Sequence, residues 1–122
     1  MEERIRFILY KGKSILLEDF SNLRPGKEFL DTLATAQKLI AVQPPKSVLA
    51  VLDATQSSFN AEILAAMKDF VRANTPYIRS SAVVGIVGLL NVGLTAVSKV
   101  RGRPFHTFPN RDAAMEFLIT QS

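Results

Sequence analysis

The chain has 122 residues, of which 48% are hydrophobic and 21% charged, a length and a composition typical of a single globular domain with a packed core. Fifteen Lys and Arg against eleven Asp and Glu give a net charge of +4, but these residues are scattered and no nucleic-acid recognition motif accompanies them, so we do not expect a nucleic-acid partner. The sequence contains no cysteine, which excludes disulfides, thiolate metal sites and a cysteine nucleophile.

The N-terminal residues and the longest uncharged stretch indicate where in the cell the protein is expected. Residues 1–4 open acidic and run into a strand pattern, without the basic and apolar regions of a signal peptide, so we expect a cytoplasmic protein. Residues 80–98 carry no charge, but Gly85, Gly88 and Gly93 interrupt them. This pattern favours a strand followed by a helix over a membrane span.

The first half of the chain predicts a hairpin, a helix and a buried strand. Residues 4–10 alternate in polarity, and Lys11-Gly12 separates them from a second apolar run at 14–20, as in a β-hairpin. Pro25 is placed to start a helix that Pro44-Pro45 ends. The apolar positions of this helix are Phe29, Leu33, Ala36 and Ile40. Residues 47–53 are apolar on both faces, which is typical of a central strand.

The second half alternates helices and strands. Asn60 is a predicted N-cap of a helix that stops at Asn74-Thr75-Pro76, and residues 81–87 read as a third buried strand. A helix over 89–101, a short strand over 105–108 and a final helix capped by Asn110 follow. The predicted order is ββαβαβαβα, which implies a single α/β domain over residues 1–122, with a mixed, largely parallel sheet covered by helices.

Ligands of such sheets bind beyond the carboxyl ends of the strands, so the loop after the central strand is the first candidate site. Asp53, Thr55, Ser57, Ser58 and Asn60 offer a carboxylate, hydroxyls and an amide just before a helix N-terminus, where a bound or covalent phosphate is favoured. The alternative is structural: Asp53 ends the strand, and the hydroxyls and Asn60 cap the helix.

Other candidate motifs are incomplete. Residues 88–95 copy the glycine spacing of a phosphate-binding loop, but Leu94 stands where that motif needs lysine. His106 is the only histidine, which leaves no histidine metal cluster, and we expect an ordinary strand residue there. We therefore predict neither a metal site nor a cofactor, and no catalytic residues.

The predicted helix after Gly88 is apolar over a wider arc than packing on one side requires. Its candidate interface or pocket residues are Leu89, Val92, Ala96 and Val100. A homodimer contact, a protein partner or a lipid-like ligand would each cover this arc, and so would the neighbouring C-terminal helix.

Several segments together resemble the STAS-like proteins, relatives of the anti-sigma-factor antagonists and of sulfate-transporter regulatory domains, and in particular a stand-alone bacterial branch. The resemblance spans residues 4–119. The segments are Tyr10-Lys11-Gly12-Lys13, Asp19-Phe20-Ser21-Asn22, residues 47–53, Asn74-Thr75-Pro76-Tyr77, residues 81–85 and Gly102-Arg103-Pro104-Phe105. The resemblance implies regulation through protein contacts rather than turnover of a substrate. The antagonists carry a phosphorylated serine in an Asp-Ser-Ser-Gly motif, where this chain has Phe59-Asn60-Ala61-Glu62, so that only Ser57 or Ser58 could substitute at a shifted position.

Three hypotheses follow for function. The first is a non-catalytic regulatory or interaction module that binds a protein partner or forms a homodimer. The second is a binding protein for a small apolar or amphiphilic ligand, with Leu89, Val92 and Ala96 as a wall and Asn91 or Ser57 orienting a polar head. The third is an enzyme that uses Asp53 with Ser57 or Ser58.

Overall fold

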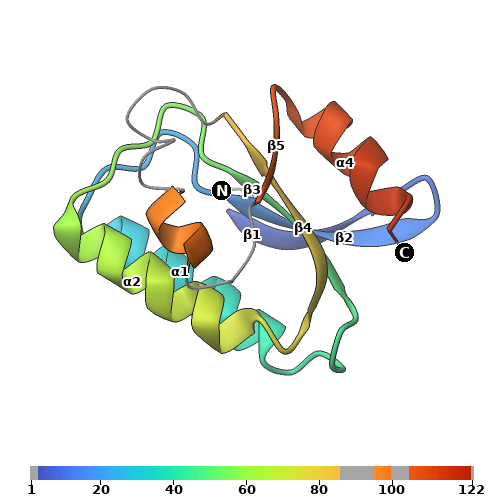
Figure 1. Ribbon diagram of the computed structural model, residues 1–122, viewed down its shortest axis with the longest axis horizontal. Coiled ribbons are helices and arrows are strands. Elements are labelled where there is room, and N and C mark those ends of the chain that lie inside the picture. Colours follow the sequence, from blue (N-terminus) through green and yellow to red (C-terminus); the bar gives the residue numbers. More distant parts are fainter. Residues whose placement is uncertain (1–2, 86–94, 100–104, 122) are drawn as a thin grey trace.

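A five-stranded sheet forms the centre of the computed structural model, which describes residues 3–85, 95–99 and 105–121 (Figure 1). The strands are β1 (Ile5–Tyr10), β2 (Lys13–Asp19), β3 (Val48–Asp53), β4 (Ile78–Val84) and β5 (His106–Phe108). They lie in the order β1-β2-β3-β4-β5. Only the hairpin pair β1-β2 is antiparallel, and the other three pairs are parallel, as the alternating pattern predicted.

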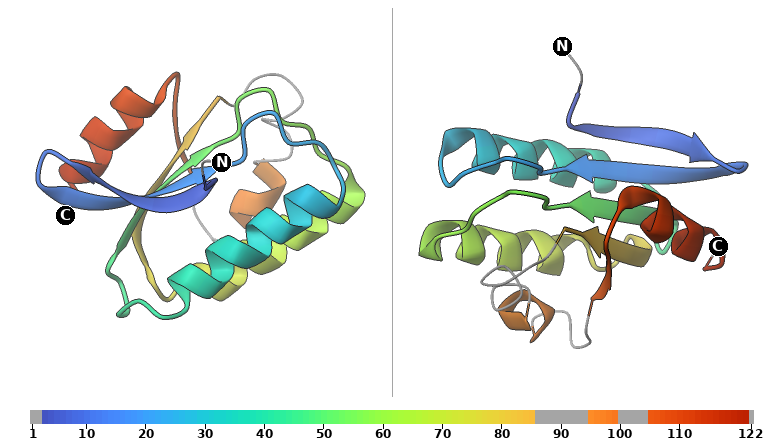
Figure 2. Two further views of the ribbon diagram at one scale, coloured as in Figure 1. Left: turned by 180° about the vertical axis from the view of Figure 1, so that it is seen from behind. Right: turned by 90° about the horizontal axis from the view of Figure 1, so that it is seen from above.

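Helices cover both faces of this sheet. α1 (Lys27–Ile40) and α2 (Ala61–Asn74) lie side by side on one face, and α4 (Arg111–Ile119) lies on the other (Figures 1 and 2). Residues 95–99 are also helical and lie on the α1/α2 side. The chain therefore has the predicted α/β architecture of a mixed, largely parallel sheet between helices.

The sheet divides the core into two clusters. The larger lies under α1 and α2 and includes all four predicted apolar positions of α1, together with Ile63, Met67 and Phe70 of α2. The smaller lies under α4 and includes Ala114, Met115 and Leu118. Both predicted asparagine caps are confirmed: the side chain of Asn60 accepts a hydrogen bond from the amide of Ile63, and that of Asn110 accepts one from Ala113, both at 2.9 Å.

Two predicted elements differ from the observed ones by two residues or more at one end or both. α1 begins at Lys27 rather than Pro25, because Gly26 has φ 147°, a conformation that glycine tolerates and a helix does not. β4 runs from Ile78 to Val84 instead of over 81–87, since its first residues pair with β3 across a local irregularity between Val48 and Leu49. The predicted helix over 89–101 is observed at 95–99, and its remainder lies outside the described residues. Within the described part of the chain, no helix is long and apolar enough to cross a membrane.

Candidate functional site at the carboxyl edge of the sheet

Two neighbouring strands end in the same local structure. At the end of β3, Asp53 Oδ1 accepts hydrogen bonds from the amide and the hydroxyl of Thr55, at 2.9 and 2.5 Å. At the end of β2, Asp19 Oδ1 accepts the same two bonds from Ser21, at 3.0 and 2.5 Å. Because Asp19 and Asp53 are paired in register, the two Asp-x-Ser/Thr turns lie beside each other. The result is a pair of carboxylates at the edge where ligands of this fold class bind.

Arg111 joins the two turns. This first residue of α4 donates from Nε to Asp53 Oδ2 at 2.7 Å, and its Nη2 lies 3.4 Å from Asp19 Oδ1. The Asp53 side chain is only 8% exposed, whereas that of Arg111 is 34% exposed. The guanidinium thus neutralises a buried carboxylate and holds the N-terminus of α4 against the loops after β2 and β3.

Arg4 supports the same cluster from the N-terminal side. Its Nη1 donates to the carbonyl oxygens of Asp19 at 3.2 Å and Ser21 at 2.9 Å. Burial by itself would raise the pKa of Asp19, but the hydrogen bonds from Ser21 and the charges of Arg111 and Arg4 outweigh it and hold that pKa below its ordinary value. Asp19 is therefore an ionised, hydrogen-bonded carboxylate at neutral pH.

The predicted loop residues have mostly structural contacts. Thr55 is exposed, and its hydroxyl is the one that bonds to Asp53. Ser57 is buried and donates to the carbonyl oxygen of Ala54 at 2.8 Å, while Ser58 is half-buried. Asn60 caps α2. The structural alternative for this loop therefore accounts for four of the five candidates, and Ser58 is the only one whose side chain has no hydrogen bond assigned to it among the described residues.

The loops after β3 and β4 are in direct contact at Gly85. This residue has φ 82°, and a Cβ atom there would lie 2.7 Å from the Cα of Thr55. Only glycine fits both the backbone conformation and the space. The turn of Thr55 is thus held from a second side, by the chain that leaves β4.

The other predicted residues are only partly described. Leu89, Val92 and Val100 lie outside the described residues, as do Asn91 and the whole glycine-rich stretch over 88–94. Ala96 is half-buried, and its neighbour Val97 is buried in the larger core cluster. Part of the apolar arc of this helix therefore packs on the protein itself. His106 is exposed, and its ring lies 4.6 Å from that of Phe117.

Sequence reasoning missed Arg111, Asp19 and Arg4 as members of the cluster. The available signal was the repeat of Asp-x-Ser/Thr at the ends of two strands, at Asp19 and at Asp53. No local pattern marks Arg111, because its partner Asp53 is 58 positions away in the sequence. Among the described residues, no group of three His, Cys, Asp or Glu side chains could hold a metal ion.

The strand order and the placement of the helices form an α/β fold of the SpoIIAA-like kind. A similar solved structure is that of an uncharacterised protein of the DUF3478 family with a SpoIIAA-like fold, from Shewanella loihica PV-4. The two chains superpose with a TM-score of 0.72 over 93% of this chain and 91% of the other, at 12% sequence identity. At this identity the likeness concerns the fold. No protein-family model and no curated protein sequence matches the chain.

Proposed function

We propose that the chain is a non-catalytic regulatory module of the STAS-like class that acts by associating with protein, with β1 as the contact strand and a second copy of the chain as the partner. The fold supports a role in binding, since STAS-like relatives regulate through protein contacts. The edge cluster supports the absence of catalysis: Asp53 bonds to Arg111 and Thr55, and the Ser57 hydroxyl donates to a backbone carbonyl, so Asp53 does not act as a base on Ser57.

The observation that carries the proposal is the exposed edge of β1. Within the described chain, β1 is the outermost strand of the sheet and pairs only with β2 (Figure 2). Two large apolar side chains on it are exposed, Phe7 at 38% and Leu9 at 79%. An open strand edge with apolar side chains pairs readily with another strand, and natural monomers usually protect such edges with charge or proline.

A second copy fits this edge by symmetry. Two β1 strands that pair antiparallel about a two-fold axis would present the same surface to each other, which is the commonest arrangement of homodimers. Leu9 of each copy would then leave water, and the open backbone groups of both edges would be paired.

The test is sedimentation velocity over a concentration series with the wild type and with Leu9→Lys. We expect a monomer–dimer equilibrium in the wild type and a dimer weakened about tenfold or more in the variant, since a buried charge opposes association. Ala65→Lys is the matched control, because Ala65 is an exposed apolar residue on α2, away from β1. A wild type that stays monomeric, or a Leu9→Lys variant that dimerises as the wild type does, would contradict the proposal.

A further inference from the structure

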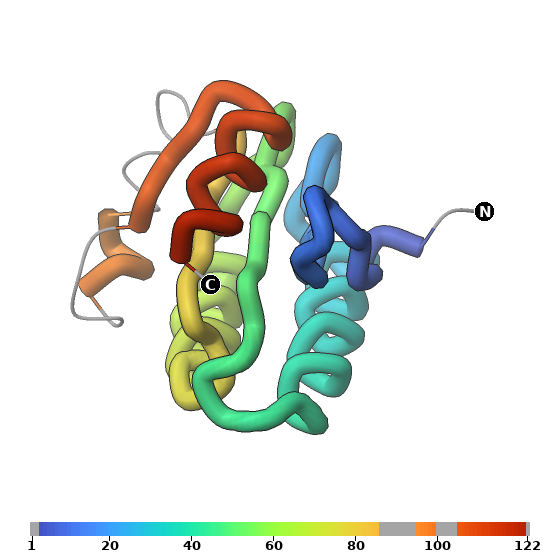
Figure 3. The backbone as a smooth tube through the Cα atoms, turned by 90° about the vertical axis from the view of Figure 1, so that its right-hand side faces the viewer, coloured from blue at the N-terminus to red at the C-terminus, as the bar shows by residue number. Residues whose placement is uncertain are grey.

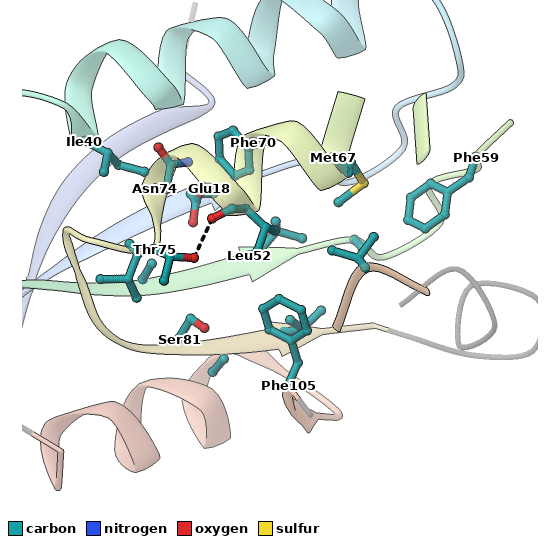
Figure 4. A pocket seen from close by; sticks show the side chains of 17 residues that line it. Glu18, Ile40, Leu52, Phe59, Met67, Phe70, Asn74, Thr75, Ser81 and Phe105 are labelled. Atoms are coloured by element: carbon teal, nitrogen blue, oxygen red, sulfur yellow. Dashed lines mark hydrogen bonds between the residues drawn. The ribbon is translucent and has the colours of Figure 1, made fainter. Parts of the chain in front are cut away.

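A cavity of about 80 Å³ lies on the α1/α2 side of the sheet (Figure 4). Its walls come from α2, from the facing side chains of β3 and β4, and from the helical segment 95–99. Most of the lining is apolar, and Leu52, Met67, Phe70, Val97 and Phe105 are among its side chains. A volume of this size admits about five to eight water-sized spheres, which corresponds to a short organic molecule.

Four polar side chains of the described chain line this mostly apolar space, those of Glu18, Asn74, Thr75 and Ser81, and two of them are buried. Glu18, on β2, and Asn74, the last residue of α2, are each 4% exposed. Figure 4 shows both side chains between α2 and the sheet. Among the described residues, neither Glu18 Oε2 nor Asn74 Nδ2 has a hydrogen-bond partner. Buried polar atoms without partners are rare in folded proteins because each costs the free energy of its lost hydration.

The chemistry of the two groups defines what would satisfy them. Burial raises the pKa of Glu18 to about 8, so at neutral pH it is mainly a neutral carboxylic acid that both donates and accepts. The amide nitrogen of Asn74 only donates. The described lining contains no Lys, Arg or His, and a ligand anion would therefore lie in an apolar site without a counter-charge. An ammonium ion has no acceptor to offer Asn74.

We propose that this cavity binds a small neutral amphiphile with a hydroxyl head, of the class of medium-chain alcohols, whose head bonds to Glu18 and Asn74 and whose hydrocarbon tail lies among the apolar side chains. A hydroxyl accepts from Asn74 and exchanges a hydrogen bond with Glu18. The site is new to this chain and goes beyond the association proposed above, which involves the edge strand β1.

The test compares three six-carbon probes that differ only in the head: 1-hexanol, hexanoate and hexylamine. Each is titrated into the isotopically labelled full chain at neutral pH, and backbone amide shifts are followed by NMR. We expect saturable shifts at Glu18, Asn74 and neighbouring lining residues, with 1-hexanol binding about tenfold or more tightly than either charged probe, the value of one buried hydrogen bond. Equal affinities for the three heads, or no saturable shifts with 1-hexanol, would overturn the proposal; the second result would leave water as the occupant.

Variants test the role of Glu18. Glu18→Leu removes the polar group and should weaken 1-hexanol about tenfold, whereas Glu18→Gln keeps a donor and an acceptor and should retain binding. Ser81→Leu, which fills the cavity from β4, should abolish binding while leaving Glu18 and Asn74 in place. Thr32→Val is the matched control: Thr32 is a buried polar residue of α1 that does not line the cavity. Unchanged affinity in Glu18→Leu would overturn the proposal. Since the head-group comparison uses the wild type alone, it decides the question even if a variant fails to fold.

Discussion

At the residue scale, the buried carboxyl of Glu18 makes the stability of the fold depend on pH. Its ordinary pKa is 4.5, and burial raises it to about 8 in the folded chain. Between these two values the folded state holds a proton that the unfolded state has released. The contribution of Glu18 to stability is therefore fully present below about pH 4.5 and is lost as the pH rises through about 8.

We accordingly predict that the Glu18 contribution to the free energy of unfolding falls by about 1.4 kcal/mol for each pH unit between about pH 5 and pH 7. Urea unfolding at several pH values, carried out on the wild type and on Glu18→Gln, measures this slope. The variant cannot titrate at this position, so the difference between the two curves isolates Glu18. If the free energy of unfolding changed with pH equally in the wild type and in Glu18→Gln, the pKa of Glu18 would be the same in the folded and unfolded states, which would contradict the prediction.

Neither the burial of Glu18 nor the role of Arg111 follows from the residues nearby in the sequence. Residues 14–20 predict the second strand of a hairpin, and a glutamate in a strand normally faces water. Glu18 is instead covered because its register partner is Leu52, on the face that α1 and α2 pack against. The contacts of both residues arise from the tertiary arrangement, which a local pattern does not encode.

At the element scale, the features that the sequence predicts correctly are those that depend on residues close together in the chain. The order of helices and strands, the apolar stripe of α1 and the caps at Asn60 and Asn110 are all confirmed, since each depends on a few adjacent residues. The start of β4 was missed because Arg79 and Ser80 break the apolar run, and the strand is set there by pairing with β3. Of the candidate site, the loop after β3 was predicted, but its partners on β2 and α4 were not.

Contacts at both of its ends hold α4 in place. At its N-terminus, Arg111 bonds to Asp53 and Asp19, and near its C-terminus Glu116 accepts a hydrogen bond from the hydroxyl of Tyr10 at 2.7 Å and pairs with Lys11 of the hairpin. The second contact is exposed to solvent, whereas the first encloses a buried carboxylate. We therefore expect the Arg111 contact to contribute more to the docking of this helix.

We predict that Arg111→Met lowers the free energy of unfolding by about 2 kcal/mol, because the substitution leaves Asp53 buried without its counter-charge. The estimate is below the usual range for buried pairs, since the Arg111 side chain is partly exposed. Arg72→Met is the matched control: Arg72 pairs with Asp69 at 3.0 Å on the surface of α2, and the loss of such a pair costs about 0–1 kcal/mol. Urea unfolding measures both. Equal losses of unfolding free energy in the two variants would show that the Arg111–Asp53 pair contributes no more than an ordinary surface ion pair.

At the scale of the whole molecule, the sheet separates two packed layers. α1 and α2 lie on one face of the sheet and α4 lies on the other (Figure 3). The larger cluster is buried under α1 and α2, and the smaller cluster is buried under α4. Leu33 lies in the first and Leu118 in the second, so no side-chain contact joins them across the sheet. Phe20 and Phe29, in contrast, both belong to the larger cluster, and their ring centroids are 5.4 Å apart.

This arrangement predicts which pairs of substitutions have additive effects. Leu33→Ala and Leu118→Ala should each lower the free energy of unfolding by about 2–5 kcal/mol. The double variant therefore combines the milder substitutions Leu33→Val and Leu118→Val, so that it still folds. Because the two sites lie on opposite faces, the double variant should lose the sum of the single losses to within about 0.5 kcal/mol.

Phe20→Leu and Phe29→Leu should instead depart from additivity by about 0.5–1.5 kcal/mol, since each removes the same ring contact. Urea unfolding of the two double-mutant cycles tests this. The unfolding is followed by far-UV circular dichroism and by NMR, and coincident transitions from the two methods establish that it is two-state. A coupling between Leu33 and Leu118 as large as that between the two phenylalanines would mean that the sheet transmits packing changes from one face to the other, and the two layers would then form one cooperative core.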